Sequence, residues 1–172
     1  MTAAAGDDLP QTAIEQHNMP SLSEDNSFDL DRFVEAQAPV YATVLGELRA
    51  GRKRTHWIWY ILPQLRGLGT SQMSMRYGLE SLAEAKAYLA HPVLGLRLRE
   101  CVRMLNALPE KDAVAVLGSI DALKLRSCLT VFAEASPDES LFREGLEKYF
   151  QGRPDTATLS LIDRATRSKS RV

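Results

Sequence analysis

Apolar residues recur along this chain at the three- and four-residue spacing of an α-helix, and no stretch prefers the alternating spacing of a β-strand. The most regular apolar stripe runs from Leu94 to Leu108, and a second runs from Leu125 to Phe132. Prolines and glycines interrupt the pattern at short intervals. The pattern therefore predicts a single compact all-α domain of seven to nine short helices, with the 94–108 helix at its centre.

Residues that commonly cap helices mark several of the expected boundaries. The candidate caps are Asp29, Thr55, Ser81, either Ser119 or Asp121, and Ser136. The expected helices cover residues 30–37, 39–50, 56–62, 82–90, 94–108, 113–117, 121–132, 137–150 and 158–162. Residues 64–78 show no period, and we expect them to form an irregular loop. Long ordered loops in compact domains are often functional.

Charge divides the chain into three parts. Residues 1–27 contain five acidic residues, no basic residue and two prolines, so we expect a flexible acidic arm there. Residues 28–162 hold the apolar stripes and form the predicted helical domain. Residues 163–172 are basic and are expected to form a frayed tail. Because the whole chain has a net charge of −1, the part that follows the arm carries +4.

The composition favours a globular protein of the cytoplasm. Apolar residues make up 45% of the chain and charged residues 25%. No secretory leader is recognisable, and no apolar run approaches the roughly 20 residues that span a bilayer. Cys101 and Cys128 lie in apolar helical patterns, as reduced buried thiols do.

The same features exclude several classes of partner. A charge of +4 without a recognised binding module indicates no specific nucleic-acid partner, and no membrane partner is expected. The three histidines and two cysteines lack metal-ligand spacing, so no metal and no cofactor are predicted.

The segment from His56 to Ser71 contains both tryptophans, a proline and two glycines. Because an indole ring is large and amphipathic, such a segment either nucleates the core or lines a pocket. Trp57 and Trp59 are two residues apart, so a helix would place them on different sides, one toward the core and one toward the following loop. We expect this segment to meet the start of the Asp121 helix and to form the main cleft.

Polar residues gathered around that cleft suggest a site for an anion. His56 and Asp121 are candidate groups for proton transfer. The candidate ligand-binding residues are Trp59, Gln64, Arg66, Gly67, Gly69, Ser71, Arg76, Tyr77 and Lys124. In this hypothesis the domain binds or processes a nucleotide-like or ribosyl anion, with aromatic rings stacking on the ligand and arginines pairing with its phosphate.

Each of these residues also has a structural interpretation. His56 can fix the third helix through a hydrogen bond, and Gly67 and Gly69 can serve a tight turn, since neither a P-loop lysine nor a preceding strand is present. Asp121 and Lys124 have the spacing of a cap and a surface pair. The second functional hypothesis is accordingly a non-enzymatic helical adaptor, which docks a protein partner through its aromatic loop.

Several separated motifs resemble a single family. They are Phe33 to Gln37, His56 to Gln64, Gly67-Leu68-Gly69, His91 to Gly95, and Asp121 to Phe132. Together they are similar to the bacterial family of domains of unknown function numbered 1810, whose members are sometimes mislabelled calpastatin. The resemblance spans about residues 28–158 and implies one helical domain without an established activity.

A second, more distant resemblance is to the NADAR superfamily of helical proteins. It rests on the run from Ala87 to Pro92, followed by Leu98 and later by Asp121. This resemblance implies chemistry linked to ADP-ribose or to N-glycosidic bonds.

Overall fold

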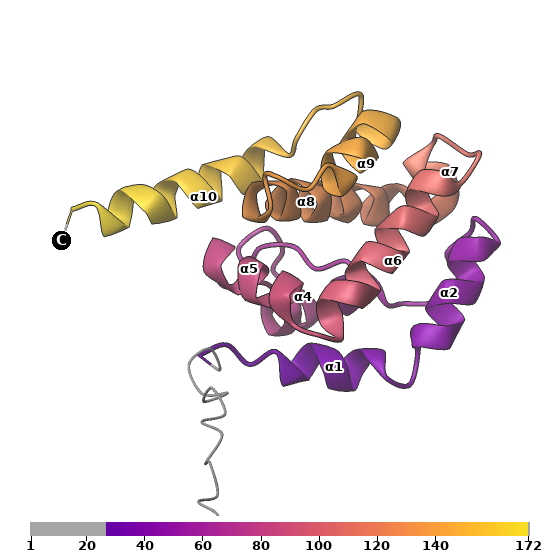
Figure 1. The fold of residues 1–172 in the computed structure, drawn as a ribbon, viewed down its shortest axis with the longest axis horizontal. Helices are drawn as coiled ribbons and strands as arrows, with labels where there is room; N and C mark the ends of the chain where they lie inside the picture. Colours follow the sequence, from indigo (N-terminus) through magenta and orange to yellow (C-terminus); the bar gives the residue numbers. More distant parts are fainter. Residues whose placement is uncertain (1–26, 172) are drawn as a thin grey trace, which may run out of the picture.

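Ten helices make up the computed structural model, which describes residues 27–171 of the chain (Figure 1). They are α1 (Asp31–Gln37), α2 (Tyr41–Arg49), α3 (Ile58–Ile61), α4 (Gln72–Tyr77), α5 (Leu82–Ala90), α6 (Leu94–Ala107), α7 (Ala113–Leu117), α8 (Ser119–Ala135), α9 (Leu141–Phe150) and α10 (Thr156–Lys169). The described residues contain no strand, only an isolated parallel bridge between Leu65 and Leu79. The all-α prediction is confirmed, with one helix more than expected. Apart from Ser27, the expected arm lies outside the described residues.

Helix α8, and not the predicted α6, is the centre of the fold. Its residues from Ser127 to Ala133 are buried without interruption, so every face of the helix is covered there. A helix covered on all sides is typical of the middle of a domain. Helix α6 instead keeps an exposed face that includes Leu96 and Arg103. Among residues 27–171, no helix is both long enough and apolar enough to cross a membrane.

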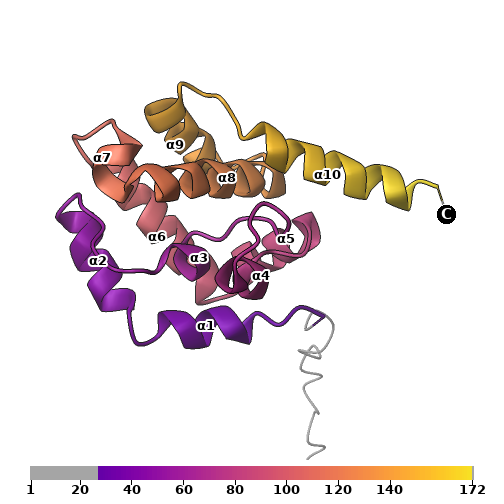
Figure 2. The same ribbon diagram turned by 180° about the vertical axis from the view of Figure 1, so that it is seen from behind.

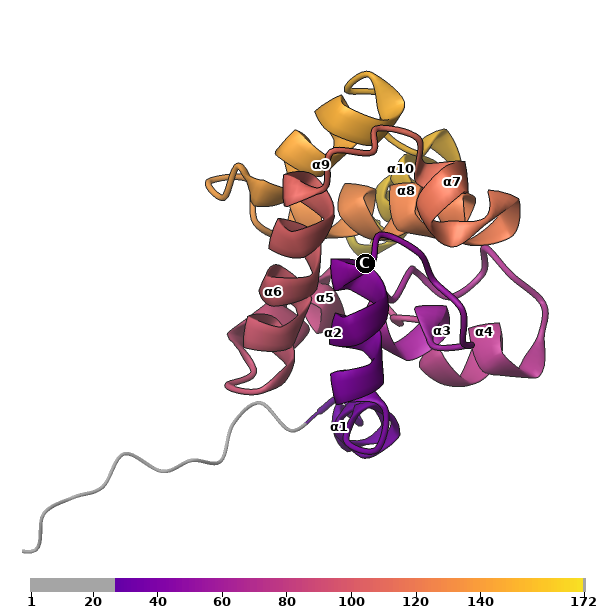
Figure 3. The same ribbon diagram turned by 90° about the vertical axis from the view of Figure 1, so that its right-hand side faces the viewer.

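The other helices are arranged around α8. Helices α5, α7, α9 and α10 pack on it directly. Figures 1 and 2 show α9 and α10 on one side of α8 and α5 on the other, while α6 runs alongside and packs against both α5 and α9. Helix α2 packs beside α6, as the view in Figure 3 shows. The long central helix thus joins the two halves of the chain.

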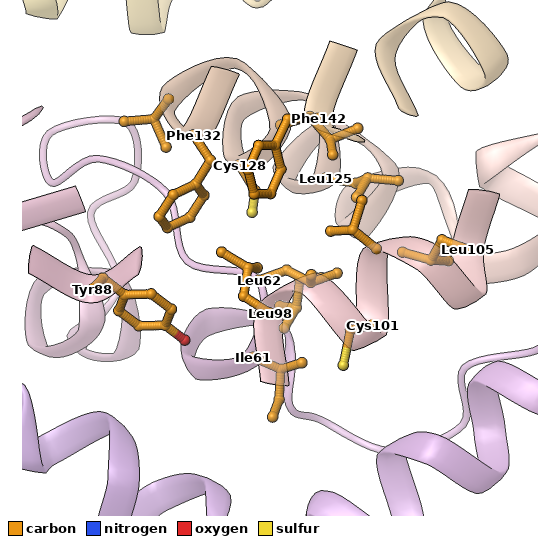
Figure 4. Close-up of a cluster of buried hydrophobic side chains, with 14 of the residues drawn as sticks. Ile61, Leu62, Tyr88, Leu98, Cys101, Leu105, Leu125, Cys128, Phe132 and Phe142 are labelled. Atoms are coloured by element: carbon orange, nitrogen blue, oxygen red, sulfur yellow. The ribbon is translucent and has the colours of Figure 1, made fainter. Parts of the chain in front are cut away.

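A row of aromatic rings crosses the core and joins four helices. Phe33 of α1 meets Tyr88 of α5 at a ring-centroid distance of 5.1 Å. Tyr88 meets Phe132 of α8 at 5.5 Å, and Phe132 meets Phe142 of α9 at 5.6 Å. Such offset and edge-on pairs each add about 0.5–1.5 kcal/mol beyond their burial. Figure 4 shows the rings of Tyr88, Phe132 and Phe142 beside the leucine side chains that fill the core.

Gln37 is a polar side chain buried beside this row. Its amide nitrogen donates to the Tyr88 hydroxyl at 2.9 Å and to the Tyr60 carbonyl oxygen at 2.7 Å. Arg97 donates to its amide oxygen at 3.4 Å. Buried polar groups require such partners, so Gln37 fixes α1 against α3 and α5.

Two of the predicted caps, Ser81 and Ser136, behave differently. Ser81 accepts a hydrogen bond from the backbone N–H of Glu84 at 3.2 Å, as predicted. The hydroxyl of Ser136 instead donates to Glu139, whose carboxylate is held by Arg99 of α6 at 2.7 Å. The predicted cap at Ser136 is therefore wrong, and α9 begins only after this segment, at Leu141.

Helices α1 and α8 begin without a side-chain cap, so the predicted caps Asp29 and Asp121 are wrong. Asp121 lies inside the first turn of α8, where its carboxylate contacts lysines instead. The residue before α8 is Gly118, with a φ of 86°. This left-handed conformation suits glycine and lets the chain turn sharply from α7 into α8.

The last helix is longer than the sequence pattern predicts. Asp155 caps α10 by accepting a hydrogen bond from the N–H of Thr158 at 3.0 Å. The helix then continues to Lys169, so residues 163–169 of the expected tail are helical. Its far end extends beyond the body of the domain (Figure 1). Basic side chains in the last turn of a helix are favourable because they face the negative end of the helix dipole.

Truncation of the core leucines tests this packing. Leu98 and Leu129 are each 1% exposed, so Leu98→Ala and Leu129→Ala should each lower the free energy of unfolding by about 2–5 kcal/mol. Leu96 of α6 is 67% exposed, and Leu96→Ala is the matched control, expected to change it by less than about 0.5 kcal/mol. Urea denaturation of the three variants measures the differences. Equal effects of Leu96→Ala and Leu98→Ala would contradict the assigned face of α6.

Candidate functional site

The two tryptophans point to different sides of α3, as predicted. Trp57, just before the helix, is 1% exposed and packs in the core, while Trp59 is half-buried. The indole N–H of Trp57 donates to the carboxylate of Glu47 in α2. The ammonium group of Lys53 lies 5.0 Å from the centre of the same ring. Trp57 is therefore a structural anchor, and Trp59 is the tryptophan available to a site.

Glu47 is a buried carboxylate that organises the approach to α3. Thr55 donates its hydroxyl hydrogen to Glu47 at 2.9 Å. Burial by itself raises the pKa of Glu47, but hydrogen bonds from Trp57, Thr55 and the backbone outweigh it and lower the pKa below its usual value. The prediction that Thr55 caps the third helix is wrong because its hydroxyl is bonded to Glu47, and α3 begins without a side-chain cap.

The segment 64–78, predicted to be irregular, contains the short helix α4. Ser71 caps it by accepting a hydrogen bond from the N–H of Ser74 at 3.1 Å. At the base of the segment, the N–H of Arg66 donates to the carbonyl of Leu79 at 2.8 Å. Ser71, a predicted ligand-binding residue, thus has a structural role in positioning α4.

A small pocket opens where α3, α4 and α8 meet, and its cavity volume is only about 10 Å³. Its lining residues are Ile58, Trp59, Leu62, Gln64, Met73, Ser74, Tyr77, Gly78 and Lys124. Four of the predicted ligand-binding residues, namely Trp59, Gln64, Tyr77 and Lys124, are therefore brought together. Gly69 lies beside the pocket, since a Cβ atom there would be 2.5 Å from the Ser74 hydroxyl oxygen.

The indole N–H of Trp59 is buried and has no hydrogen-bond partner among the described residues. The ammonium group of Lys124 lies 4.7 Å from the centre of the Trp59 ring. An unpaired donor and a cation thus converge on one pocket. A buried donor without an acceptor costs free energy of about 1–3 kcal/mol, which an acceptor in the pocket would recover.

Asp121 stands beside this pocket, between two lysines. Lys53 contacts one of its carboxylate oxygens at 2.8 Å, whereas Lys124 lies 3.5 Å from the other. The first contact is a close ion pair, and the second is at the limit of a hydrogen bond. Lys53 is therefore the main partner of Asp121, and Lys124 keeps most of its hydrogen-bonding capacity. Lys53 was not among the predicted site residues, although it lies in the run of cations before the aromatic segment.

His56 is exposed, and its imidazole makes no hydrogen bond with a described residue. It does not line the pocket. Its backbone lies near Asp121, because Lys53 binds both the Asp121 carboxylate and the carbonyl oxygen of Thr55. The start of α8 and the aromatic segment therefore meet as expected, but the prediction that they form the main cleft is wrong, because the groove beside α1 is much larger.

The remaining predicted ligand-binding residues line other surfaces. Arg66 and Arg76 are exposed and line a groove with α1, where Arg76 lies over the outer side of Tyr77 at 5.3 Å. Gly67, with a φ of 103°, approaches Leu161 of α10. The predicted set thus divides between two surfaces. Ser74 and Met73 of the pocket were missed, because nothing in a non-periodic segment indicates the six-residue helix that carries them.

The sequence pattern of the family described as "Protein of unknown function (DUF1810)" matches residues 27–162, which is most of the chain. The chain belongs to this family. It is also similar to a solved structure, the conserved hypothetical protein Rv1873 from Mycobacterium tuberculosis, with 50% sequence identity and a TM-score of 0.78. The similarity covers 79% of this chain and 97% of that one. No curated protein matches.

The adaptor hypothesis predicts an exposed apolar patch on the aromatic segment of this DUF1810 domain. The large apolar side chains that are exposed in the described part are Met75, Leu96, Val114, Ile120 and Leu123. Met75 alone among them belongs to the segment 56–78. The aromatic rings of the segment face the core or the small pocket, which favours a ligand site over a docking surface there.

The two thiols of the DUF1810 domain are inside the core. Burial raises the pKa of the Cys101 thiol to about 12 and also raises the pKa of Cys128. A thiol that stays protonated in an apolar environment is a poor nucleophile. Among the described residues, no group of three or more histidine, cysteine and acidic side chains could hold a metal ion.

Glu47→Gln tests the buried carboxylate of the DUF1810 domain. Because the folded-state pKa of Glu47 is lowered, the ionised group stabilises the fold above its unfolded-state pKa, and this contribution disappears as pH falls through the folded-state pKa. Glu47→Gln should therefore cost about 1–3 kcal/mol at neutral pH and much less at about pH 3. The exposed Glu35→Gln is the control. Urea unfolding at both pH values is the measurement, and a cost independent of pH would contradict the assignment.

Proposed function

We propose that the domain binds a small anionic ligand, of a nucleotide-like or ribosyl kind, at the Trp59 pocket. The observation that carries the proposal is the buried, unpaired N–H of Trp59 beside the Lys124 ammonium group. A buried hydrogen-bond donor and a positive charge that border the same pocket are complementary to a negatively charged oxygen. The ligand class comes from the resemblance to the NADAR superfamily.

The pocket size restricts what can enter. The cavity volume is about 10 Å³, far below the roughly 300–1,000 Å³ typical of sites that enclose a whole ligand and about enough for one water-sized group. One oxygen atom of a phosphate or carboxylate group fits this space, while the rest of the ligand lies outside. Gln64 and Ser74 line the same pocket and offer further polar groups to the anion.

Asp121 and His56 remain our proposed proton-transfer groups. Asp121 lies next to Lys124 and is held in place by Lys53, so its carboxylate has a fixed position at the edge of the pocket. His56 is accessible to solvent on the adjoining backbone. Substitution of either residue should reduce turnover without weakening ligand binding, because neither side chain lines the pocket.

Calorimetry and thermal unfolding with ADP-ribose, AMP and inorganic phosphate test the proposal. ADP-ribose at about 100 times its dissociation constant should stabilise the domain by about 2.7 kcal/mol. Lys124→Met and Trp59→Phe should each weaken binding by about tenfold, because each removes one interaction with the anion. Trp59→Phe keeps an aromatic ring and removes the N–H.

Lys111→Met, a change of the same kind at an exposed lysine outside the pocket, is the control and should bind as wild type does. Arg66→Ala and Arg76→Ala decide between the two surfaces. If they abolish binding while Lys124→Met does not, the ligand occupies the groove beside α1 and the proposal is wrong. Absence of binding by all three compounds would also overturn it.

A further inference from the structure

A second and larger depression lies between α5 and α10, with a volume of about 1,080 Å³ including its open side. We call it the α5–α10 groove. Its lining residues are Leu65, Arg66, Glu80, Ser81, Leu82, Ala83, Lys86, Leu161, Ile162, Ala165, Thr166, Lys169 and Ser170. Four large aliphatic side chains therefore form an apolar floor, which is contributed by two distant parts of the chain.

The charges of this groove are predominantly positive. Arg66, Lys86 and Lys169 are exposed, and none of them forms an ion pair with a described residue. Glu80 is the single acidic residue among the lining residues. A groove with apolar floor and unpaired cations is complementary to a peptide that combines acidic and aliphatic side chains.

Residues 1–26 of this chain have that composition. They contain five acidic residues and no lysine or arginine. They also contain the aliphatic or thioether side chains Leu9, Ile14, Met19 and Leu22. The segment joins the described fold at Ser27 and Phe28, which line a neighbouring groove that also includes Arg66 and Glu80. The point of attachment is therefore next to the α5–α10 groove.

We propose that the N-terminal segment, residues 1–26, docks in the α5–α10 groove of its own chain. An extended chain spans roughly 3.3 Å per residue, so about ten residues reach over 30 Å, and the segment is long enough to follow the groove. Because the segment is tethered to the domain, its effective concentration at the groove is on the order of millimolar. The segment can therefore occupy the groove even if its affinity is weak.

A second copy of the chain is a poorer occupant of the groove. The outer half of α10 carries Arg164, Arg167 and Lys169, all exposed. Pairing this helix with its counterpart in another copy would bring like charges together. The acidic segment instead neutralises these cations, so charge complementarity favours the intramolecular contact.

A spin label on residue 16 of the full chain tests the proposal. Gln16→Cys provides the attachment point, and the native Cys101 and Cys128 are fully buried, so labelling is selective. We expect loss of the amide NMR signals of Lys86 in α5 and Ala165 in α10, both of which line the groove. Raising the salt concentration should restore these signals, because screening weakens contacts between exposed charges.

Charge reversal provides the matched comparison. Lys86→Glu together with Lys169→Glu should restore the signals of the groove, whereas Lys111→Glu together with Arg143→Glu, at exposed cations outside it, should leave the loss unchanged. The contact is contradicted if no signal is lost, or if the loss falls on another surface. Signal loss in isotope-labelled chains caused by a spin label on other chains would assign the groove to a second copy, and would also overturn the proposal.

Discussion

The burial of α8 through the middle of its length is the constraint on which the rest of the fold depends. From Ser127 to Ala133 the helix has no exposed face, and the surrounding helices cover it there. Its polar side chains must then find partners inside the domain. Thr130 donates to the carbonyl of Arg126 at 2.8 Å and accepts from the N–H of Asp155 at 2.8 Å. The core helix thereby holds the chain where it turns into α10.

The candidate site lies where this cover ends. The first two turns of α8 reach the surface, and Asp121 and Lys124 lie there. Facing them is the aromatic segment, which Glu47 fixes to α2 through Trp57. The packing that excludes charged side chains from the interior therefore places them at the edge of the core.

The apolar period was sufficient to predict the helical class, the buried stripes and the separate roles of Trp57 and Trp59. Caps were predicted less well, because Thr55 and Glu139 have partners that are distant in sequence, Glu47 and Arg99. Helix α4 was missed because the segment that contains it, residues 64–78, shows no apolar period. Sequence spacing likewise could not predict that Arg66 and Arg76 line a different groove from Trp59. Their placement depends on the backbone hydrogen bonds between residues 64–66 and residue 79.

The buried amide of Gln37 has a consequence for the neighbouring indole. By binding the carbonyl of Tyr60, the residue after Trp59, it immobilises the end of α3 from the direction of α1. The Tyr88 hydroxyl in turn limits the movement of that amide. The backbone next to Trp59 is therefore held in place without a bound molecule. Binding of a ligand in the proposed Trp59 pocket would cost little backbone conformational entropy.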